Sequence, residues 1–342
     1  MLPATAIDPD AARKGAGEAR LVVPATLLFL ACLWSFVAYW ALDARQETID
    51  RTEQLLRHAD AAASEQTRRV IWRTTDFLAV ADQWLSDNPD ADAAHDARFL
   101  RLVDAFVQRT GRTVSVHLAA EDGTLSALGT PLPDFTRALG EQDYFRAAVG
   151  GDTRQSHIGL PETSGPNGIW QIPIAHRLSR QTKTGAALVA TLQLPALLSL
   201  YEEFRLRPGG AVVLLRRDGR LLARTPHDER LVGESLAGGQ LYREFLPRAE
   251  RGFGRIERTA TDARDKYIGY SVLGDLPLVV VVSAAVEDVL APWRRQTIAV
   301  GLLAALLSAT LLVAARRLAR TLGRLSARNA ELELLATNDA LT

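Results

Sequence analysis

The chain has 342 residues, and its 40 lysine and arginine residues balance its 40 aspartate and glutamate residues. This zero net charge excludes the strongly basic field that general nucleic-acid binding needs, so we predict no nucleic-acid partner. The single cysteine, Cys32, excludes an intrachain disulfide and leaves the redox compartment open.

Two uncharged apolar stretches, residues 21–42 and 297–315, stand out from the rest of the sequence. Each is long enough to cross a hydrocarbon core of about 30 Å as a helix. A cleaved signal peptide is the alternative for the first stretch, but the apolar run is too long and no small-residue cleavage site follows it. A buried core helix is the alternative for the second, and its length and lack of charge disfavour it. We therefore predict two transmembrane helices in a lipid bilayer.

Basic residues flank both stretches on the sides that face the chain termini. By the positive-inside rule, both ends of the chain are predicted to be cytoplasmic, with residues 1–20 as a polar, disordered N-terminal tail. Residues 43–295 then lie outside the cytoplasm, in the periplasm of a bacterium with two membranes. The predicted location is the bacterial inner (cell) membrane, as a multi-pass protein.

A long helix is predicted to leave the first membrane span. Residues 43–85 contain almost no glycine or proline, and their apolar residues are mostly three or four apart. The sequence SDNP at residues 86–89 is predicted to end this stalk helix. A second helix is predicted at residues 92–109, with Phe99, Val103 and Phe106 on one face.

The region that follows is rich in strands, and an Asp-Gly pair at residues 122–123 marks a hairpin turn. A short helix is predicted at residues 141–149, before a glycine pair. Strands are predicted at residues 113–119, 124–128, 154–160, 169–178 and 186–194.

A second set of elements repeats this order after a helix predicted at residues 195–204. It opens with another hairpin, whose turn is Asp218-Gly219. Its strands are predicted at residues 211–215, 220–224, 254–260, 266–272 and 278–283. This weak internal repeat predicts two copies of one α+β module, each a helix-backed antiparallel sheet.

Several short sequences resemble the double Cache family of sensor regions. DYFR at residues 143–146, HIGLP at 157–161, GIW at 168–170 and RL at 177–178 resemble its membrane-distal half. DGRLLARTP at residues 218–226 and YIGY at 267–270 resemble its membrane-proximal half.

The resemblance implies a fold in which the stalk helix carries two tandem PAS-like Cache modules between two transmembrane helices. The distal module would cover about residues 43–205, and the proximal module about residues 206–292. It also implies an extracytoplasmic sensor of small molecules, here an unknown periplasmic one.

Five residues lie on the helix and strands that line the pocket in Cache modules, which makes them candidate ligand contacts. An arginine among them could hold a carboxylate bidentately. The alternatives are that the tryptophan belongs to the core, that the first arginine is solvated, and that the second pairs across the sheet. The motif of amino-acid-binding Cache sensors is not visible. The candidates are Tyr144, Arg146, Trp170, Gln171 and Arg177.

No metal site, catalytic residue or cofactor site is predicted within this chain. Its histidines show no paired ligand spacing, and no sequence pattern groups serine, histidine and aspartate into a triad.

The segment at residues 316–336 is predicted to be a cytoplasmic coiled-coil linker. Its apolar positions are alternately four and three residues apart, which suits a parallel homodimer, and a seam asparagine would fix the register. The alternative is an amphipathic helix lying on the membrane. The predicted seam comprises Leu318, Leu322, Leu325, Asn329 and Leu332.

The last residues, ATNDALT at 336–342, resemble the segment that opens a GGDEF domain. Residues 337–342 would then be the start of a truncated GGDEF domain. The resemblance implies a diguanylate cyclase, which joins two GTP molecules into cyclic di-GMP with Mg²⁺ when two such domains meet. The alternatives are the sensor portion of a histidine kinase or chemoreceptor, or a stand-alone membrane binding protein.

Overall fold

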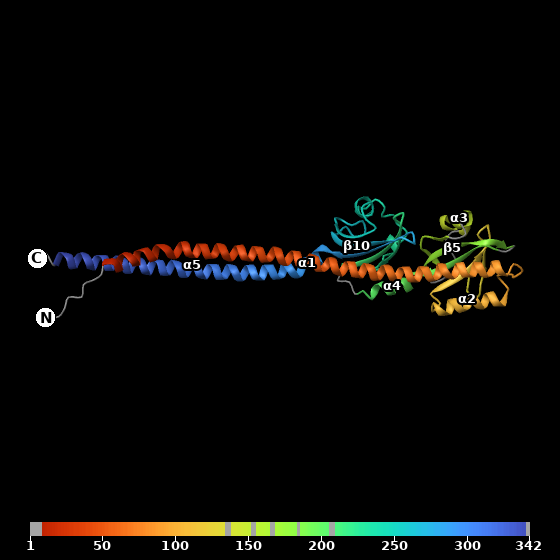
Figure 1. The fold of residues 1–342 in the computed structure, drawn as a ribbon, viewed down its shortest axis with the longest axis horizontal. Coiled ribbons are helices and arrows are strands. Elements are labelled where there is room, and N and C mark those ends of the chain that lie inside the picture. Colours follow the sequence, from red (N-terminus) through yellow and green to blue (C-terminus); the bar gives the residue numbers. More distant parts are fainter. Residues whose placement is uncertain are drawn as a thin grey trace. The chain divides into compact units, whose positions relative to one another are not determined.

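The computed structural model describes residues 9–133, 138–151, 155–164, 168–182, 185–204 and 209–339. The chain divides into two compact units (Figure 1). One unit is Arg51–Val289. The other combines Met1–Asp50 with Leu290–Thr342.

The first element, α1, is one continuous helix over Pro9–Asp87. The prediction of a disordered tail over residues 1–20 is therefore wrong from Pro9 onward, and the first eight residues lie outside the described part. Proline is favoured in the first turn of a helix, and the alanine-rich stretch after it has high helix propensity. The helix ends at Asp87, where the predicted SDNP stop lies.

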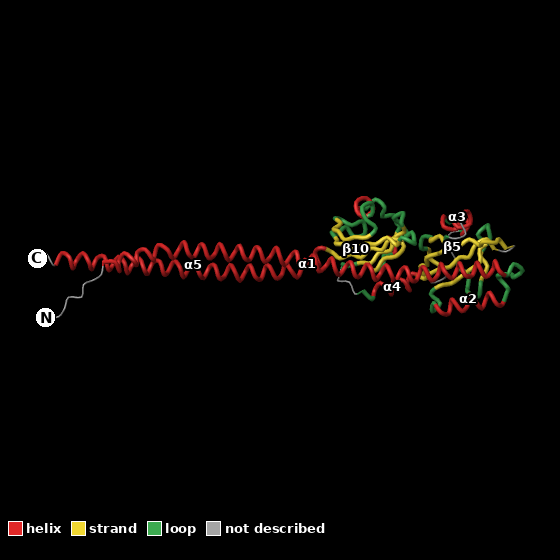
Figure 2. The backbone as a smooth tube through the Cα atoms, in the orientation of Figure 1, coloured by secondary structure: helices red, strands yellow, loops and turns green. Residues whose placement is uncertain are grey.

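The unit that contains both chain ends is built from two helical segments, residues 9–50 of α1 and residues 290–339 of α5 (Val286–Asp339). Trp34 Nε1 donates a hydrogen bond to Ser308 Oγ over 3.2 Å, and Trp293 Nε1 donates one to the Ala41 carbonyl over 2.8 Å. Figure 2 shows these two helical segments side by side. Both helices contain a stretch long and apolar enough to cross a membrane. Two apolar helices thus flank the folded region.

The predicted seam lies in the last part of α5. Leu318 and Leu325 are 51% and 53% exposed, as expected for side chains that a second helix would cover. The side chains of Asn329 and Leu332 lie outside the described residues, as do residues 340–342. The dimer therefore stays a prediction.

The distal module is an antiparallel sheet in the order β2-β1-β6-β5-β3, with β4 also paired to β5. Figure 1 shows α3 over one face of this sheet and α1 with α2 along the other. The elements are α2 (Ala97–Arg109), β1 (Val114–Ala119), β2 (Leu125–Ala127), α3 (Asp143–Gly150), β3 (Ser156–Ile158), β4 (Glu162–Ser164), β5 (Ile169–Thr182) and β6 (Gly185–Gln193), with a single turn at Leu139–Glu141.

Helix α2 begins five residues later than predicted, because Asp96 caps it. The Asp96 carboxylate accepts hydrogen bonds from the backbone N–H groups of Arg98 and Phe99, which have no partner within the helix. The predicted apolar face then packs on α1. The ring centroids of Phe106 and Phe77 are 3.9 Å apart in a stacked arrangement, and those of Phe99 and Trp84 are 5.2 Å apart. Burial of each such ring contributes about 1.5–3 kcal/mol.

The proximal module repeats the arrangement, with strand order β8-β7-β11-β10-β9. In both sheets the opening hairpin lies beside the last strand, which confirms the predicted repeat. The elements are α4 (Leu194–Glu202), β7 (Ala211–Arg216), β8 (Leu221–Thr225), short helical turns at Glu229–Leu231 and Leu241–Phe245, β9 (Arg251–Ile256), β10 (Lys266–Leu273) and β11 (Leu278–Ala285).

Strand β9 ends at Ile256, four residues before the predicted end. Arg258 adopts a left-handed conformation with φ of 46°, and the Thr259 N–H donates to the Arg264 carbonyl over 3.0 Å, so a turn replaces the strand.

The stalk part of α1 packs against both modules and forms side-chain hydrogen bonds with them. Thr67 Oγ1 lies 2.6 Å from the hydroxyl of the buried Tyr201 on α4. Ser271 on β10 donates a hydrogen bond to the carboxylate of Asp60, which is 4% exposed. The fold is α+β with antiparallel sheets, as predicted.

Candidate functional site

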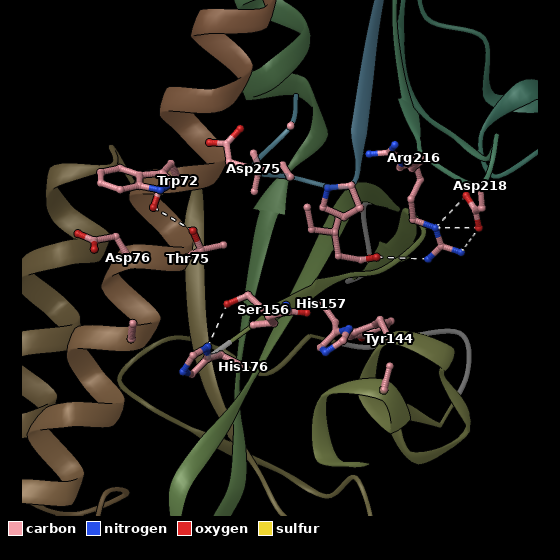
Figure 3. Close-up of a pocket in the computed structure, with 18 of the residues that line it drawn as sticks. Trp72, Thr75, Asp76, Tyr144, Ser156, His157, His176, Arg216, Asp218 and Asp275 are labelled. Atoms are coloured by element: carbon pink, nitrogen blue, oxygen red, sulfur yellow. Dashed lines mark hydrogen bonds and ion pairs between the residues drawn. The ribbon is translucent and has the colours of Figure 1, made fainter. Parts of the chain in front are cut away.

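A cavity of about 860 Å³ lies where the stalk helix and the two modules meet. Trp72 comes from α1, Tyr144 and His157 come from the distal module, and Arg216 and Pro277 come from the proximal module. Figure 3 shows Tyr144 and His157 together at one end of this cavity and Arg216 with Asp218 above them. We call this space the junction cavity.

Arg216 of the proximal module lines the junction cavity and contacts the distal module. Its Nη2 lies 2.6 Å from Asp218 Oδ2 in the same module and 3.1 Å from Asp143 Oδ2 at the start of α3. Its Nη1 donates to the Ile158 carbonyl over 3.3 Å. The hydrogen bond with Asp218 and the nearby carboxylate of Asp143 raise the pKa of Arg216. The guanidinium is thus a fixed cation that ties α3 and β3 to the proximal sheet.

A buried polar cluster lies between the stalk helix and the distal sheet, and two of its members, Ser156 and His176, line the junction cavity. Asp82 of α1 accepts hydrogen bonds from the Ser179 N–H over 2.8 Å and from the Ser179 hydroxyl over 2.5 Å. His176 Nε2 lies 3.7 Å from Asp82, and His176 Nδ1 lies 3.0 Å from Ser156 Oγ. Burial alone would raise the pKa of Asp82, but the nearby His176 ring and the two hydrogen bonds from Ser179 outweigh it and lower that pKa.

This cluster contains a serine, a histidine and an aspartate, but its geometry does not suit nucleophilic catalysis. A triad needs the histidine held by a direct carboxylate hydrogen bond, and here Asp82 is 3.7 Å from His176 while both of its oxygens serve Ser179. The cluster therefore joins α1 to β5. Among the described residues, no group of histidine, cysteine and carboxylate side chains could hold a metal ion.

The face of the distal sheet under α3 carries a second set of polar groups. Residues directly opposite each other in paired strands lie on the same face. His117 is opposite Val189, which is opposite Ala175, and both of these pack with Tyr144 in the core under α3. Ser115 and Thr191 lie on this face too, with their hydroxyls 2.5 Å apart. We call His117, Ser115, Thr191, Gln171 and Tyr144 the distal polar face.

Three atoms of the distal polar face are buried and have no hydrogen-bond partner among the described residues: His117 Nδ1, Tyr144 Oη and Gln171 Oε1. Burial lowers the pKa of His117 to about 4, so its ring is neutral at physiological pH. Burial also raises the pKa of Tyr144, with Glu162 and Asp143 adding to the effect. A buried polar atom without a partner costs about 1–3 kcal/mol, so these atoms are suited to hydrogen-bond a ligand.

A cavity of about 380 Å³ at the end of the sheet contacts two residues of the distal polar face, Ser115 and Gln171. Ser115, Gln171 and Gln193 line it together with the loop after β2. The ring of Tyr144 packs directly against the backbone of Gly159. A Cβ at Gly159 would lie 2.7 Å from Tyr144 Cε1, so this contact requires glycine.

The structure brings together only some of the five candidate ligand residues. Tyr144 and Gln171 lie on the distal polar face, whereas the preceding residue in the strand, Trp170, points to the opposite face. Arg146 is exposed and donates to the Glu141 carbonyl. Arg177 donates to the Gly151 carbonyl over 2.9 Å. Within the described part, both arginines thus hydrogen-bond to backbone carbonyls.

Sequence reasoning missed His117, Asp82, His176 and Arg216. The available signal for His117 is its place in a strand. Because side chains alternate along a strand, His117 is predicted to share a sheet face with Ser115 and Ala119. Nothing in the sequence predicts that Asp82 meets Ser179, because 97 residues separate them.

The comparisons with known proteins agree with this architecture. The family model described as "dCache_1_like: Histidine kinase sensor domain" matches residues 196–284, which cover most of α4 and nearly all of the proximal module. A dCache-type sensor domain is therefore present in this chain. No curated protein matches the chain in sequence.

Solved structures of sensor domains resemble a larger part of the chain. The extracellular domain assigned to the histidine kinase rpHK1S-Z16 is 25% identical with a TM-score of 0.58, over 72% of this chain and 99% of that one. The periplasmic sensory domain of the Campylobacter jejuni chemoreceptor Tlp1 is 13% identical with a TM-score of 0.56, over 72% and 99%.

The ligand-binding domain of the Pseudomonas fluorescens chemoreceptor CtaA, solved with L-isoleucine, is 17% identical with a TM-score of 0.52, over 72% of this chain and 98% of that one. These likenesses extend the dCache fold to both modules. The chain thus carries an extracellular-type sensor domain between two apolar helices.

Proposed function

We propose that this chain is the sensory and membrane-spanning part of a receptor, and that it binds a small hydrogen-bonding molecule on the distal polar face. One observation carries the proposal: His117 Nδ1, Tyr144 Oη and Gln171 Oε1 are buried without partners among the described residues. Natural proteins rarely leave several buried polar atoms unpaired in one place unless a ligand or water completes them.

These three groups are uncharged and favour a hydrogen-bonding end on the ligand, while the buried carboxylate of Glu162, opposite Gln171, is close enough to Tyr144 to raise its pKa. His117 is neutral, Tyr144 is protonated, and Gln171 offers an amide. The bidentate arginine clamp that the sequence suggested has no support, because Arg146 and Arg177 bind backbone carbonyls. The amino acids bound by similar chemoreceptor domains are therefore one class to test beside purines, amides and sugars.

The proposed topology follows from the arginines after the second apolar span. Five arginines between residues 316 and 328 favour a cytoplasmic C-terminal end, which places the sensor domain in the periplasm and the protein in the bacterial inner membrane. The boundaries proposed from the sequence, with spans at 21–42 and 297–315, fall inside α1 and α5.

The proposed output is a GGDEF domain after residue 336, with a homodimer formed through the leucine seam of α5. Its support is the resemblance of residues 336–342 and the heptad spacing that begins at Leu318. A ligand that binds two states of the sensor unequally would change the register or spacing of this seam. Mg²⁺ and GTP would then belong to that output domain.

A histidine kinase or chemoreceptor output is the second candidate. The description of the matching family model and the likeness to rpHK1S-Z16 favour it. The full-length protein in nanodiscs, supplied separately with GTP and with ATP, would separate these outputs. Cyclic di-GMP supports the cyclase, and phosphohistidine supports the kinase. Absence of cyclic di-GMP from a dimeric, GTP-bound protein would rule out the cyclase.

A further inference from the structure

The proximal module contains its own cavity, of about 380 Å³, on one face of its sheet. The strand registers place Ile268 opposite Ser283, and Val281 opposite Val213, so these cavity-lining residues share one face. The neighbouring residue Gly269 points the other way, where a Cβ would lie 2.9 Å from the Leu56 carbonyl of α1. The sheet therefore separates this cavity from the stalk.

The cavity has the composition of a small-molecule site. Its floor is apolar, with Ala211, Val213, Ile256, Ile268 and Val281, and the segment that bears Leu241 closes it from above. Pockets of roughly 300–1,000 Å³ with apolar walls and a few placed polar groups are typical of ligand sites.

Three cationic residues line this cavity, and of these Lys266 is buried while Arg243 and Arg258 are exposed. The Lys266 side chain is 2% exposed, and its Nζ lies 2.6 Å from Asp262 Oδ2. Burial lowers the pKa of Lys266, and Asp262 only partly offsets this, with Arg224 and Arg264 nearby lowering it further. An ammonium group has three N–H donors, and Asp262 is its one partner among the described residues.

A second donor lies in the same module, on β8, and its positive charge helps to lower the pKa of Lys266. Arg224 Nε is buried and has no hydrogen-bond partner in the described part of the chain, although Arg224 Nη1 donates to the Pro226 carbonyl over 2.7 Å. Arg264 is engaged elsewhere, 3.4 Å from Glu287 and 3.8 Å from Asp288. Arg224 lies outside the lining of the cavity, so Lys266 is the buried cationic donor that a negatively charged acceptor in the cavity would meet.

We propose that this cavity is a second ligand site, which binds a small monocarboxylic acid with an apolar body. The carboxylate accepts a hydrogen bond from Lys266, and the hydrocarbon body lies on Val213, Ile268 and Val281. This proposal stands apart from the distal site, because it uses none of the residues of the distal polar face.

The position of the site gives it a route to the second apolar helix. Val281 and Ser283 line the cavity from β11, and β11 continues directly into α5 at Val286. A ligand on this face thus touches the strand from which α5 begins. A carboxylate metabolite bound here would modulate the response set by the distal module.

Benzoate and hexanoate are suitable probes, with benzyl alcohol and benzylamine as matched compounds of other charge. We expect calorimetry on the full chain in nanodiscs to show benzoate binding at least 10-fold tighter than benzyl alcohol or benzylamine. Lys266→Met should weaken benzoate at least 10-fold and Lys266→Arg less. Arg255→Gln removes an exposed ion pair of the same module and should change the affinity less than 2-fold. Equal affinity for acid and alcohol, or an unchanged affinity in Lys266→Met, would overturn the proposal.

A second measurement uses the wild-type chain and so does not depend on how Lys266→Met folds. The chain has three lysines, Lys14, Lys183 and Lys266. Benzoate should slow acetylation of Lys266 at least 5-fold, as read by peptide mass spectrometry, and leave Lys14 and Lys183 unchanged. Acetylation of Lys266 at the same rate with and without saturating benzoate would also overturn it. Because the readout is Lys266 itself, the result is independent of binding at the distal site.

Discussion

Arg216 on β7 and Asp143 at the start of α3 form an ion pair of 3.1 Å across the two modules. Asp143 immediately precedes Tyr144, whose hydroxyl is among the atoms of the distal polar face that have no partner within the described residues. A ligand that moves α3 would therefore pull on the proximal sheet through this pair, and that sheet continues into α5.

Removal of Arg216 should cost more stability than removal of its distal partner. Arg216→Ala loses contacts to Asp143, Asp218 and the Ile158 carbonyl, and should lower the free energy of unfolding by about 1–3 kcal/mol. Asp143→Ala should cost less than about 1 kcal/mol, because the Asp143 side chain is 59% exposed. Thermal unfolding of the variants checks the order. Arg57→Ala, which removes an exposed ion pair within α1, is the control. If Arg57→Ala and Arg216→Ala destabilise the protein equally, Arg216 does not stabilise the contact between the modules.

The Asp82 carboxylate should contribute strongly to the stability of the contact between the stalk helix and the distal sheet. Asp82→Ala leaves the Ser179 N–H and hydroxyl without their acceptor inside a buried interface, so it should cost about 2–4 kcal/mol. For a unit of this size, that corresponds to an apparent Tm roughly 5–12 °C lower. Asp87→Ala, which removes an exposed bond to Gln83, should leave the Tm nearly unchanged. Equal Tm values for the two variants would show that Asp82 contributes little.

Asp60 should make the attachment of the stalk sensitive to pH. Burial raises the pKa of Asp60 to about 6, although Ser271 and Arg251 partly offset this. Between an ordinary aspartate pKa near 4 and this value, the folded state binds more protons than the unfolded state, so stability falls as pH rises through this window. The total effect is on the order of 2–3 kcal/mol.

Asp60→Asn should remove this loss while it keeps an acceptor for Ser271. Thermal unfolding at intervals from pH 4 to pH 7.5 measures the difference between the two proteins, in which other titrating groups cancel. The variant should gain on the wild type as pH rises toward 6 and hold its advantage above it. Parallel curves would mean that Asp60 does not titrate in this range.

Gly269 should be required for close contact between the stalk and the proximal sheet. An added Cβ would lie 2.9 Å from the Leu56 carbonyl and 3.5 Å from Asp60 Cβ, so Gly269→Ala should destabilise the protein by about 1–3 kcal/mol. Gly274→Ala is the matched control, since a Cβ at that position would have no described atom within 4 Å. Calorimetry of both variants would test this, and equal Tm values would argue against a tight interface.

Local patterns in the sequence were enough to predict the fold. The alternation in β1, the Asp-Gly turns and the apolar face of α2 are local signals, and the two sheets follow from them. The candidate site was less predictable, because it depends on register. Trp170 and Gln171 are adjacent in sequence, yet their side chains lie on opposite faces of the sheet because side chains alternate along a strand. Asp60 and Asp82 resemble any exposed helical aspartate until the sheets cover them.

The most direct test of the account is ligand binding at the distal polar face. The full chain in nanodiscs would be screened by thermal unfolding against amino acids, amides, purines and sugars, in parallel with His117→Leu and Tyr144→Phe. We predict that at least one compound raises the Tm of the wild type and that its effect is lost in His117→Leu and weakened in Tyr144→Phe. A compound whose stabilisation survives both substitutions, or a screen in which no compound shifts the Tm, would contradict the account.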